Sequence, residues 1–230
     1  MNYKKLGKSG VEVSELILGC WAMGGDYFGA TEDESSLEAL QVSYENGVNT
    51  FDTAEIYGSG RSERVVGEAA RRIGREKVKI ISKVFKPSMA HDKMVKACED
   101  SLSRLGTDYL DVYFLHYPIP EEEVSIQERM ETMTELKKAG KIRAIGMSTH
   151  NPRVALLAAK SGVVDVIMFS VNPAYDLLPP TEDVDSIFEK ETYENALSST
   201  DPERQELYSL CESRGVALTC LLYTSPSPRD

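Results

Sequence analysis

The hydrophobic pattern of the chain alternates between short apolar runs and longer segments in which apolar residues recur every three or four positions. Apolar runs with little alternation predict strands that are covered on both faces, and helical spacing predicts amphipathic helices. The predicted strands are residues 15–20, 48–53, 78–84, 109–116, 142–148, 164–170 and 215–219. This repeated order of strand and helix is typical of a parallel sheet covered by helices.

Helices are expected between these strands, each with one apolar face. Thr31 and Glu34 have the spacing of a capping box, so they predict the start of the first helix, which Gly47 ends. Asn151 and Pro152 predict the start of a shorter one. The apolar faces are Leu37, Leu40 and Tyr44; Val65, Val66, Ala69, Ala70 and Ile73; Met94, Cys98, Leu102 and Leu105; Ile126, Met130, Met133 and Leu136; and Leu207, Leu210 and Cys211.

The fold class is α/β, and a (β/α)₈ barrel is the architecture we expect. A doubly wound sheet is the alternative, but no G-x-G-x-x-G turn follows the first strand, which counts against its dinucleotide-binding form. Seven strands can be counted where a barrel has eight, and a complete barrel has about 250 residues. Residues 1–219 therefore predict an incomplete barrel without the last strand and helix, preceded by a β-hairpin whose turn contains Gly7 and Gly10.

The last residues, 220–230, have the sequence CLLYTSPSPRD, which changes abruptly from an apolar strand to a string of serine and proline. This sequence matches the translation of a transposon-type sequencing adapter. We therefore expect this tail to be foreign to the natural protein and exclude it from the fold, as a fusion scar would be. The barrel of the natural protein would then continue past Thr219.

Charge and composition exclude several classes of partner. The formal net charge is −11, so nucleic acids and anionic membrane surfaces would be repelled. The N-terminus has no secretory signal and no apolar run approaches the length of a membrane span, so we expect a cytoplasmic protein. Its four cysteines form no C-x-x-C pair and are expected to be free thiols.

Four ionisable side chains follow three neighbouring strands, at the point where each strand ends. Asp52 closes the second strand and Tyr57 lies in the loop after it, Lys83 lies near the end of the third, and His116 closes the fourth. In a parallel barrel the carboxyl ends of the strands form one rim, where active sites lie. These four residues are therefore the candidate catalytic set.

The sequence resembles the aldo-keto reductases over residues 3–219. The motifs that carry the resemblance are FDTAEIYG at residues 51–58, SER at 62–64, ISKV at 81–84, YFLHYP at 113–118, IGMS at 145–148 and NPAYD at 172–176, in the family's order. The resemblance implies NAD(P)H-dependent reduction of an aldehyde or ketone, that is, a small carbonyl substrate and an NADP or NAD cofactor. It also implies that Asp52, Tyr57, Lys83 and His116 are the catalytic tetrad.

The chemistry of such a reduction explains the four residue types. Hydride transfer to a carbonyl carbon leaves an alkoxide, and Tyr57 would protonate it. Lys83 is expected to lower the pKa of this phenol below its usual value near 10, and Asp52 to hold the ammonium in an ion pair. His116 would orient the carbonyl oxygen by a hydrogen bond.

Cofactor residues carry over less completely. Ser148 matches a family serine that binds the nicotinamide carboxamide, whereas Thr149 stands where the family has asparagine. Asn172 matches a family asparagine after the sixth strand, and Met168 replaces a family glutamine. Gly19 lies where relatives contact the nicotinamide, and Trp21 where they line the substrate pocket. The family's residues for the adenosine 2′-phosphate follow the eighth strand.

Three alternatives remain open from the sequence. One is a non-catalytic barrel that senses a bound nucleotide, and another is a fragment without activity, since an unclosed barrel exposes two strand edges. The third is a metal-dependent hydrolase using His116 and Asp52, although the chain has no H-x-H pair. The long acidic connection at residues 169–197 also resembles a bacterial subgroup with a C-terminal ferredoxin-like [4Fe–4S] segment. Its cluster cysteines are absent here, so a cluster is expected only in a segment beyond this chain.

Overall fold

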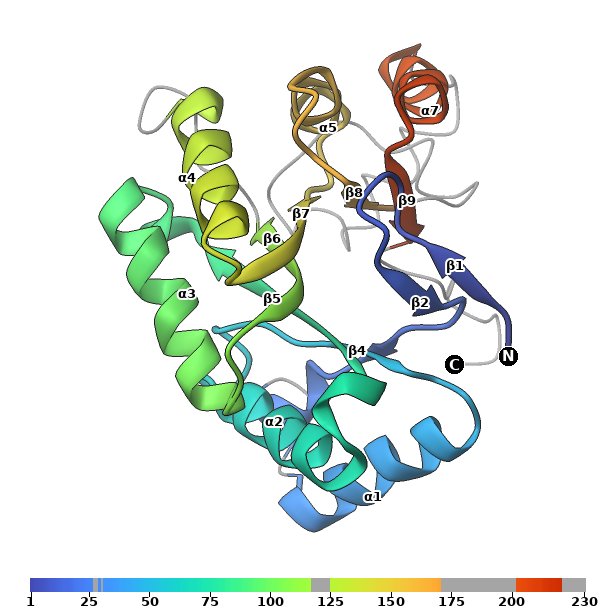
Figure 1. Cartoon of the computed structure of the whole chain (residues 1–230), viewed down its shortest axis with the longest axis vertical. Coiled ribbons are helices and arrows are strands. Elements are labelled where there is room, and N and C mark those ends of the chain that lie inside the picture. The colour runs from blue at the N-terminus through green and yellow to red at the C-terminus, as the bar shows by residue number, and fades with distance from the viewer. Residues whose placement is uncertain (27–28, 30, 117–124, 171–201, 221–230) are drawn as a thin grey trace.

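A seven-stranded parallel sheet forms the centre of the computed structural model, which describes residues 1–26, 29, 31–116, 125–170 and 202–220 (Figure 1). The strands follow one another in space as they do in the chain, with every neighbouring pair parallel. They are β3 (Leu18–Gly19), β4 (Thr50–Asp52), β5 (Lys79–Phe85), β6 (Leu110–His116), β7 (Ile142–Ser148), β8 (Val166–Phe169) and β9 (Ala217–Cys220). This sequential order confirms the barrel over the doubly wound sheet, whose first strand lies in the interior.

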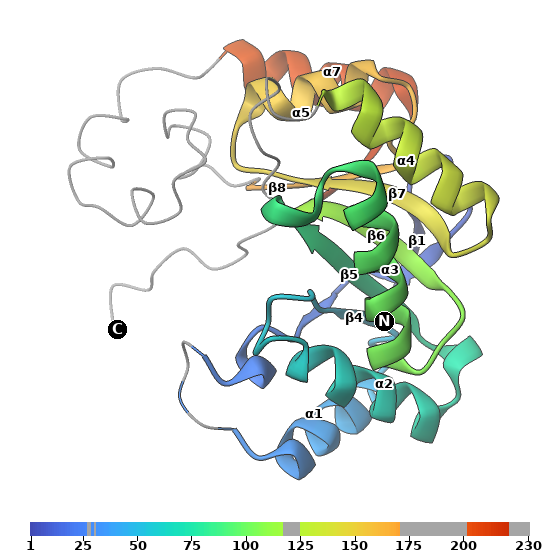
Figure 2. The ribbon, with the colours of Figure 1, turned by 90° about the vertical axis from the view of Figure 1, so that its left-hand side faces the viewer.

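The helices cover the outer face of the curved sheet, as Figure 2 shows from a second side. They are α1 (Asp33–Glu45), α2 (Arg61–Ile73), α3 (His91–Leu105), α4 (Ile126–Lys138), α5 (Pro152–Lys160) and α7 (Pro202–Arg214), with short 3₁₀ helices η1 (Ala22–Gly24), η2 (Arg75–Lys77) and η3 (Lys86–Ser88). The predicted apolar faces of the helices are buried against the sheet or packed at its margin. Burial of these faces supplies most of the stabilisation of such short helices.

A second, smaller core fills the concave side of the sheet. Its strand residues point to the face opposite the helices, and residues of the N-terminal segment complete it. It consists of Leu6, Val11, Val13, Ile81, Val112, Phe114, Ala144, Val166 and Met168. The strands are therefore apolar on both faces, which explains why their sequences lack the alternation of half-exposed strands.

Of the two helix starts predicted from capping residues, one is confirmed and one is wrong. Asn151 caps α5 as expected, because its side chain accepts a hydrogen bond from the backbone N–H of Arg153 at 3.0 Å. The capping box of Thr31 and Glu34 is wrong. Helix α1 begins at Asp33 after Glu32, and no side chain caps it. The carbonyl of Thr31 instead accepts a hydrogen bond from Arg61 in α2, so a tertiary contact fixes this residue outside the helix.

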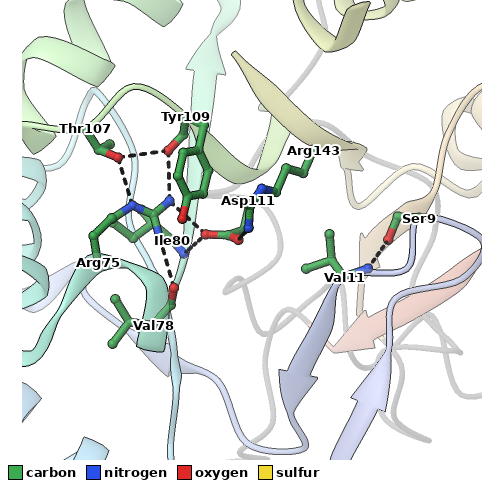
Figure 3. A network of polar contacts seen from close by, with 9 residues as sticks. All are labelled: Ser9, Val11, Arg75, Val78, Ile80, Thr107, Tyr109, Asp111 and Arg143. Atoms are coloured by element: carbon green, nitrogen blue, oxygen red, sulfur yellow. Dashed lines mark hydrogen bonds and ion pairs between the residues drawn. The ribbon is translucent and has the colours of Figure 1, made fainter. Parts of the chain in front are cut away.

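Asp111 organises the amino-terminal end of the sheet (Figure 3). This buried carboxylate accepts hydrogen bonds from Arg75 at 2.8 Å, from Arg143 at 3.1 Å and from the backbone N–H of Ile80 at 3.0 Å. Both guanidinium groups also lie over the ring of Tyr109, at 4.0 and 3.8 Å from its centre. Since the two guanidinium groups compensate the buried carboxylate, the network stabilises the fold at the end opposite the rim that carries sites in barrels.

The predicted hairpin is present and lies at this same end. Strands β1 (Tyr3–Lys5) and β2 (Glu12–Ser14) pair antiparallel. Gly7 in the turn has a φ of +51°, and a Cβ added there would lie 2.4 Å from the carbonyl oxygen of Asp165 and 2.5 Å from that of Gly215. These residues precede β8 and β9, so the turn packs directly against backbone at the start of two strands.

Some expectations fall outside the described residues. These are the acidic connection from residue 171 onward, with Asn172 in it, and the tail from residue 221. In the part of the chain that is described, no helix is both long and apolar enough to cross a membrane.

Replacing Gly7 with alanine should lower the free energy of unfolding by about 3 kcal/mol, because strain at positive φ adds to a clash with two carbonyl oxygens. Gly10→Ala is the matched control in the same turn, since Gly10 also has a positive φ, of 76°, but nothing lies within 4 Å of an added Cβ. It should cost only about 1 kcal/mol. Urea denaturation measures both values, and equal losses would show that the turn does not dock on the barrel.

Candidate functional site

The four predicted catalytic residues meet at the carboxyl end of the sheet. Asp52 is the last residue of β4, Lys83 lies in β5, His116 ends β6, and Tyr57 follows β4 in the loop to α2. The parallel register pairs Asp52 with Ile81 and aligns His116 with Phe85, so the three strand ends lie at one rim. Sheet geometry alone therefore brings distant parts of the sequence together.

The ammonium group of Lys83 is at the centre of the site. It forms an ion pair with Asp52 Oδ1 at 2.7 Å and donates hydrogen bonds to the carbonyl oxygen of Thr53 at 2.7 Å and to the phenol oxygen of Tyr57 at 3.3 Å. The Lys83 side chain is 0% exposed. The ammonium group thus has two hydrogen-bond acceptors, and the Asp52 carboxylate beside it balances its charge.

Burial and ion pairing shift the pKa values of Lys83 and Asp52 in opposite directions. Burial lowers the pKa of Lys83, but the nearby Asp52 and Tyr57 outweigh it and raise the pKa to about 12. Burial raises the pKa of Asp52, and the charge of Lys83 opposes that shift. The lysine therefore stays positively charged throughout the physiological pH range.

Tyr57 differs from the expectation in one respect. Burial raises the pKa of its phenol, and the positive charge of Lys83, which lowers it, offsets only part of that rise. The expectation that Lys83 brings this pKa below its usual value is therefore wrong, although the lysine acts in the expected direction. The phenol is protonated at neutral pH, and because its oxygen accepts from Lys83, its own proton is not used in that bond.

His116 is a neutral imidazole in this site. Burial first, and then the charge of Lys83, hold its pKa well below the usual range, and only 3% of the residue is exposed. Its ring stands at 90° to the ring of Tyr57 with the centres 6.1 Å apart, and it also contacts Phe85 edge-on at 5.8 Å. A neutral imidazole beside the phenol can donate a hydrogen bond without adding a charge.

The loop that carries Tyr57 rests on the segment after β3. The indole of Trp21 stacks on the phenol ring with the centres 6.0 Å apart and is itself 40% exposed. Asp26 accepts a hydrogen bond from the backbone N–H of Gly58 at 2.7 Å. A Cβ on Gly58 would lie 2.3 Å from the carbonyl oxygen of Gly24, so the two backbones touch. No pattern in the sequence pointed to Asp26, because its partner is a backbone group 32 residues away.

The predicted cofactor residues lie at the same rim. Gly19 ends β3 and has open space around the position of a Cβ. Ser148 ends β7 and is completely buried, and its hydroxyl has no hydrogen-bond partner among the described residues. Thr149 is also buried, but its hydroxyl oxygen accepts from the backbone N–H of Asn151 at 3.0 Å. Ser148 is thus a polar group aimed at no acceptor or donor of the described chain.

The cysteines and the possible metal ligands form no second site among the described residues. Cys20, Cys98 and Cys211 are buried free thiols, and burial raises the pKa of Cys98 to about 12 and that of Cys211 to about 11. Within the described ranges, no group of three or more His, Cys, Asp or Glu side chains is arranged to hold a metal ion. The hydrolase alternative therefore gains no support from this part of the chain.

The sequence matches the Aldo/keto reductase family model over residues 15–222. The chain belongs to this family. It is 35% identical over 208 residues to the aldo-keto reductase YhdN of Bacillus subtilis, an alignment that covers 86% of the chain and 57% of YhdN. The chain spans about half of the length of the curated relatives it matches.

Solved structures of the family have the same fold. The thermostable aldo-keto reductase Tm1743, solved with the inhibitor epalrestat, superposes with a TM-score of 0.76 at 32% identity, covering 100% of the chain and 76% of that protein. An aldo/keto reductase from Klebsiella pneumoniae, solved with NADP and acetate, gives a TM-score of 0.71 at 26% identity, covering 94% of the chain and 66% of that protein. The seven-stranded parallel sheet with its helices therefore has the family's fold.

The three histidines should be separable by NMR titration of their ring nitrogens. His91 forms contacts with Asp92 and Glu135 that raise its pKa, burial lowers the pKa of His150 to about 4, and His116 should stay neutral into the acidic range. Because unfolding returns His116 and His150 to the usual pKa of about 6.5, stability should fall as the pH drops below that value. Single His→Gln variants assign the resonances, and a His116 signal that titrates at or above its usual value would contradict the neutral imidazole.

Proposed function

We propose that the protein catalyses the NAD(P)H-dependent reduction of an aldehyde or ketone to an alcohol. The observation that carries the proposal is the buried Lys83 ammonium, which forms an ion pair with Asp52 and a hydrogen bond with Tyr57. Family membership supports it, as does the NADP bound to the relative from Klebsiella pneumoniae. The proposed cofactor is NADP or NAD, and the proposed substrate is a small carbonyl compound.

In this proposal the side chains of the chain handle the proton and the carbonyl oxygen. The cofactor, when bound, supplies a hydride to the carbonyl carbon. His116 donates a hydrogen bond that orients the carbonyl oxygen, and Tyr57 gives that oxygen its phenol proton. Lys83 then faces a phenolate at the oxygen that it already contacts, and the ion pair with Asp52 keeps the ammonium in place. Trp21, half-exposed beside Tyr57, forms a wall of the substrate pocket.

The rim offers a fitting place for the cofactor. Ser148 has a buried hydroxyl without a partner among the described residues, and a carboxamide could both donate to it and accept from it. Gly19 leaves open space at the end of β3, where a side chain would otherwise reduce the room for a planar ring. Thr149 and Asn172 complete the proposed cofactor residues.

Replacing Tyr57 with phenylalanine should lower kcat for a small aldehyde by about 100-fold or more, because the general acid is removed. Tyr113→Phe is the matched control, since Tyr113 is a completely buried tyrosine whose hydroxyl has no partner among the described residues. Cofactor oxidation in the presence of the aldehyde measures both variants. Normal turnover by Tyr57→Phe would refute the proposal. Tight cofactor binding without turnover of any carbonyl by the unaltered protein would favour a nucleotide-sensing barrel.

Replacing Ser148 with alanine should weaken binding of the nicotinamide cofactor about fivefold, because one hydrogen bond to the cofactor is lost. The same change should leave the stability of the cofactor-free chain equal or up to about 1 kcal/mol higher, since it removes an unsatisfied buried group. Ser101→Ala is the control, because the Ser101 hydroxyl already accepts from Arg104 at 3.1 Å. It should lose stability and keep its affinity. Unchanged affinity in Ser148→Ala would separate this residue from the cofactor.

A further inference from the structure

A closed ring of hydrogen bonds lies behind the Lys83 ammonium and includes Ser62, in the first turn of α2. The hydroxyl of Thr53 donates to Ser62 Oγ at 2.8 Å, and Ser62 Oγ donates to the carbonyl oxygen of Cys20 at 2.8 Å. The backbone N–H of Cys20 donates to the carbonyl oxygen of Asp52 at 2.8 Å. Because Asp52 and Thr53 are consecutive, these bonds join the ends of β3 and β4 to α2.

The ring is sealed from solvent. Thr53, Ser62 and Cys20 are all completely buried, so water cannot replace a bond that is lost. The hydroxyl of Ser62 acts as acceptor and donor at once. Its removal would leave the Thr53 hydroxyl unsatisfied and would leave the Cys20 carbonyl only the backbone N–H of Met23, at 3.2 Å. A buried hydroxyl without a partner costs more than the bond itself contributes, so the geometry around Thr53 would change to satisfy it.

Thr53 connects the ring to the catalytic ammonium. Its carbonyl oxygen accepts from Lys83 Nζ at 2.7 Å, which is shorter than the 3.3 Å contact from Nζ to Tyr57. Its own backbone N–H donates to the carbonyl oxygen of Ile81 at 2.9 Å. The peptide groups around Thr53 are thus held by β5, and its side chain is held by Ser62. A rotation here would carry the Lys83 ammonium with it and change the contact with Tyr57.

Glu63, the next residue of α2, gives a useful contrast. It is also completely buried and bonds to Ser82 at 2.6 Å and to Arg104. These partners lie in β5 and α3, and none of them belongs to the ring behind Lys83. The first turn of α2 therefore supplies two buried polar side chains, of which Ser62 is the one connected to the ammonium.

We propose that Ser62 is a positioning residue for the proton donor. By tying Thr53 to the end of β3, it keeps the Thr53 carbonyl aimed at Lys83 and so leaves one N–H of the ammonium directed at Tyr57. The effect on turnover rests on the proposed reductase function. The effect on the bond between Lys83 and Tyr57 is independent of it.

The test measures that bond directly. The full chain is labelled with ¹³C at the Cζ atoms of tyrosine, and the Tyr57 resonance, which senses hydrogen bonding to the phenol oxygen, is assigned with Tyr57→Phe and recorded at neutral pH. Ser62→Ala and Thr53→Val remove the same hydrogen bond from its two sides. Ser62→Thr keeps the hydroxyl, and Ser101→Ala is a matched buried serine outside the ring.

The resonance should shift in Ser62→Ala and in Thr53→Val by more than in Ser101→Ala, and Ser62→Thr should restore its original position. The double variant should shift no further than Thr53→Val alone, because the Ser62 side chain reaches Thr53 only through the bond that Thr53→Val already removes. In carbonyl reduction, Ser62→Ala should lower kcat about tenfold with an unchanged KM and unchanged cofactor affinity.

An unmoved Tyr57 resonance in folded Ser62→Ala, or fully additive shifts in the double variant, would overturn the proposal. If Ser62→Ala does not fold, Thr53→Val decides the same question, since valine keeps the shape of threonine and lacks only the hydroxyl. If the unaltered protein reduces no carbonyl, the proposed function fails, while the resonance shifts still support or overturn the role of Ser62.

Discussion

The buried ammonium group of Lys83 is the interaction on which the arrangement of the site depends. A charge that is completely removed from water is tolerated only when it is paired with an opposite charge and hydrogen-bonded. Here the opposite charge is the Asp52 carboxylate, and the hydrogen-bond acceptors are the Thr53 carbonyl and the Tyr57 oxygen. These three groups come from a strand end, the residue after it and a loop. Strand register, the start of α2 and the loop after β4 must all be correct before the charge is satisfied.

The two ends of the sheet use buried charge differently. At the amino-terminal end, Asp111 is enclosed by Arg75 and Arg143, and both guanidinium groups lie over Tyr109. These charged groups bind one another, so the network contributes to the stability of the fold. At the carboxyl end, the phenol proton and the Ser148 hydroxyl have no acceptor among the described residues. This difference agrees with the general rule for parallel barrels, in which active sites lie at the carboxyl end of the strands and residues at the amino-terminal end serve stability.

Hydrophobic periodicity and the polar residues at strand ends were enough to predict much of the fold and the position of the site. The order of strands, the apolar helix faces such as Leu40 and Met94, and the meeting of the tetrad at one rim all result from patterns that repeat along the chain. The capping box predicted for α1 was wrong because Arg61, 30 residues further along the chain, binds the Thr31 carbonyl. The contacts of Asp26 and of Ser62, which the sequence showed only as part of a motif, were missed for the same reason, since the partner groups are brought near only by the fold. The predicted decrease in the pKa of Tyr57 was wrong because burial raises this pKa by more than Lys83 lowers it, and the sequence does not quantify burial.

The raised pKa of Tyr57 changes the way in which Lys83 supports the proposed reaction. A phenol that stays protonated at neutral pH is ready to donate at every encounter with substrate, and an alkoxide is a strong enough base to take the proton. The positive charge is then needed most after the transfer, when a phenolate would otherwise be left in a buried site. His116 is kept neutral partly by the same charge, so it does not compete with Lys83 for that phenolate. Burial therefore keeps the donor protonated, while the buried ammonium helps to keep the orienting imidazole neutral and would stabilise the phenolate that proton transfer leaves.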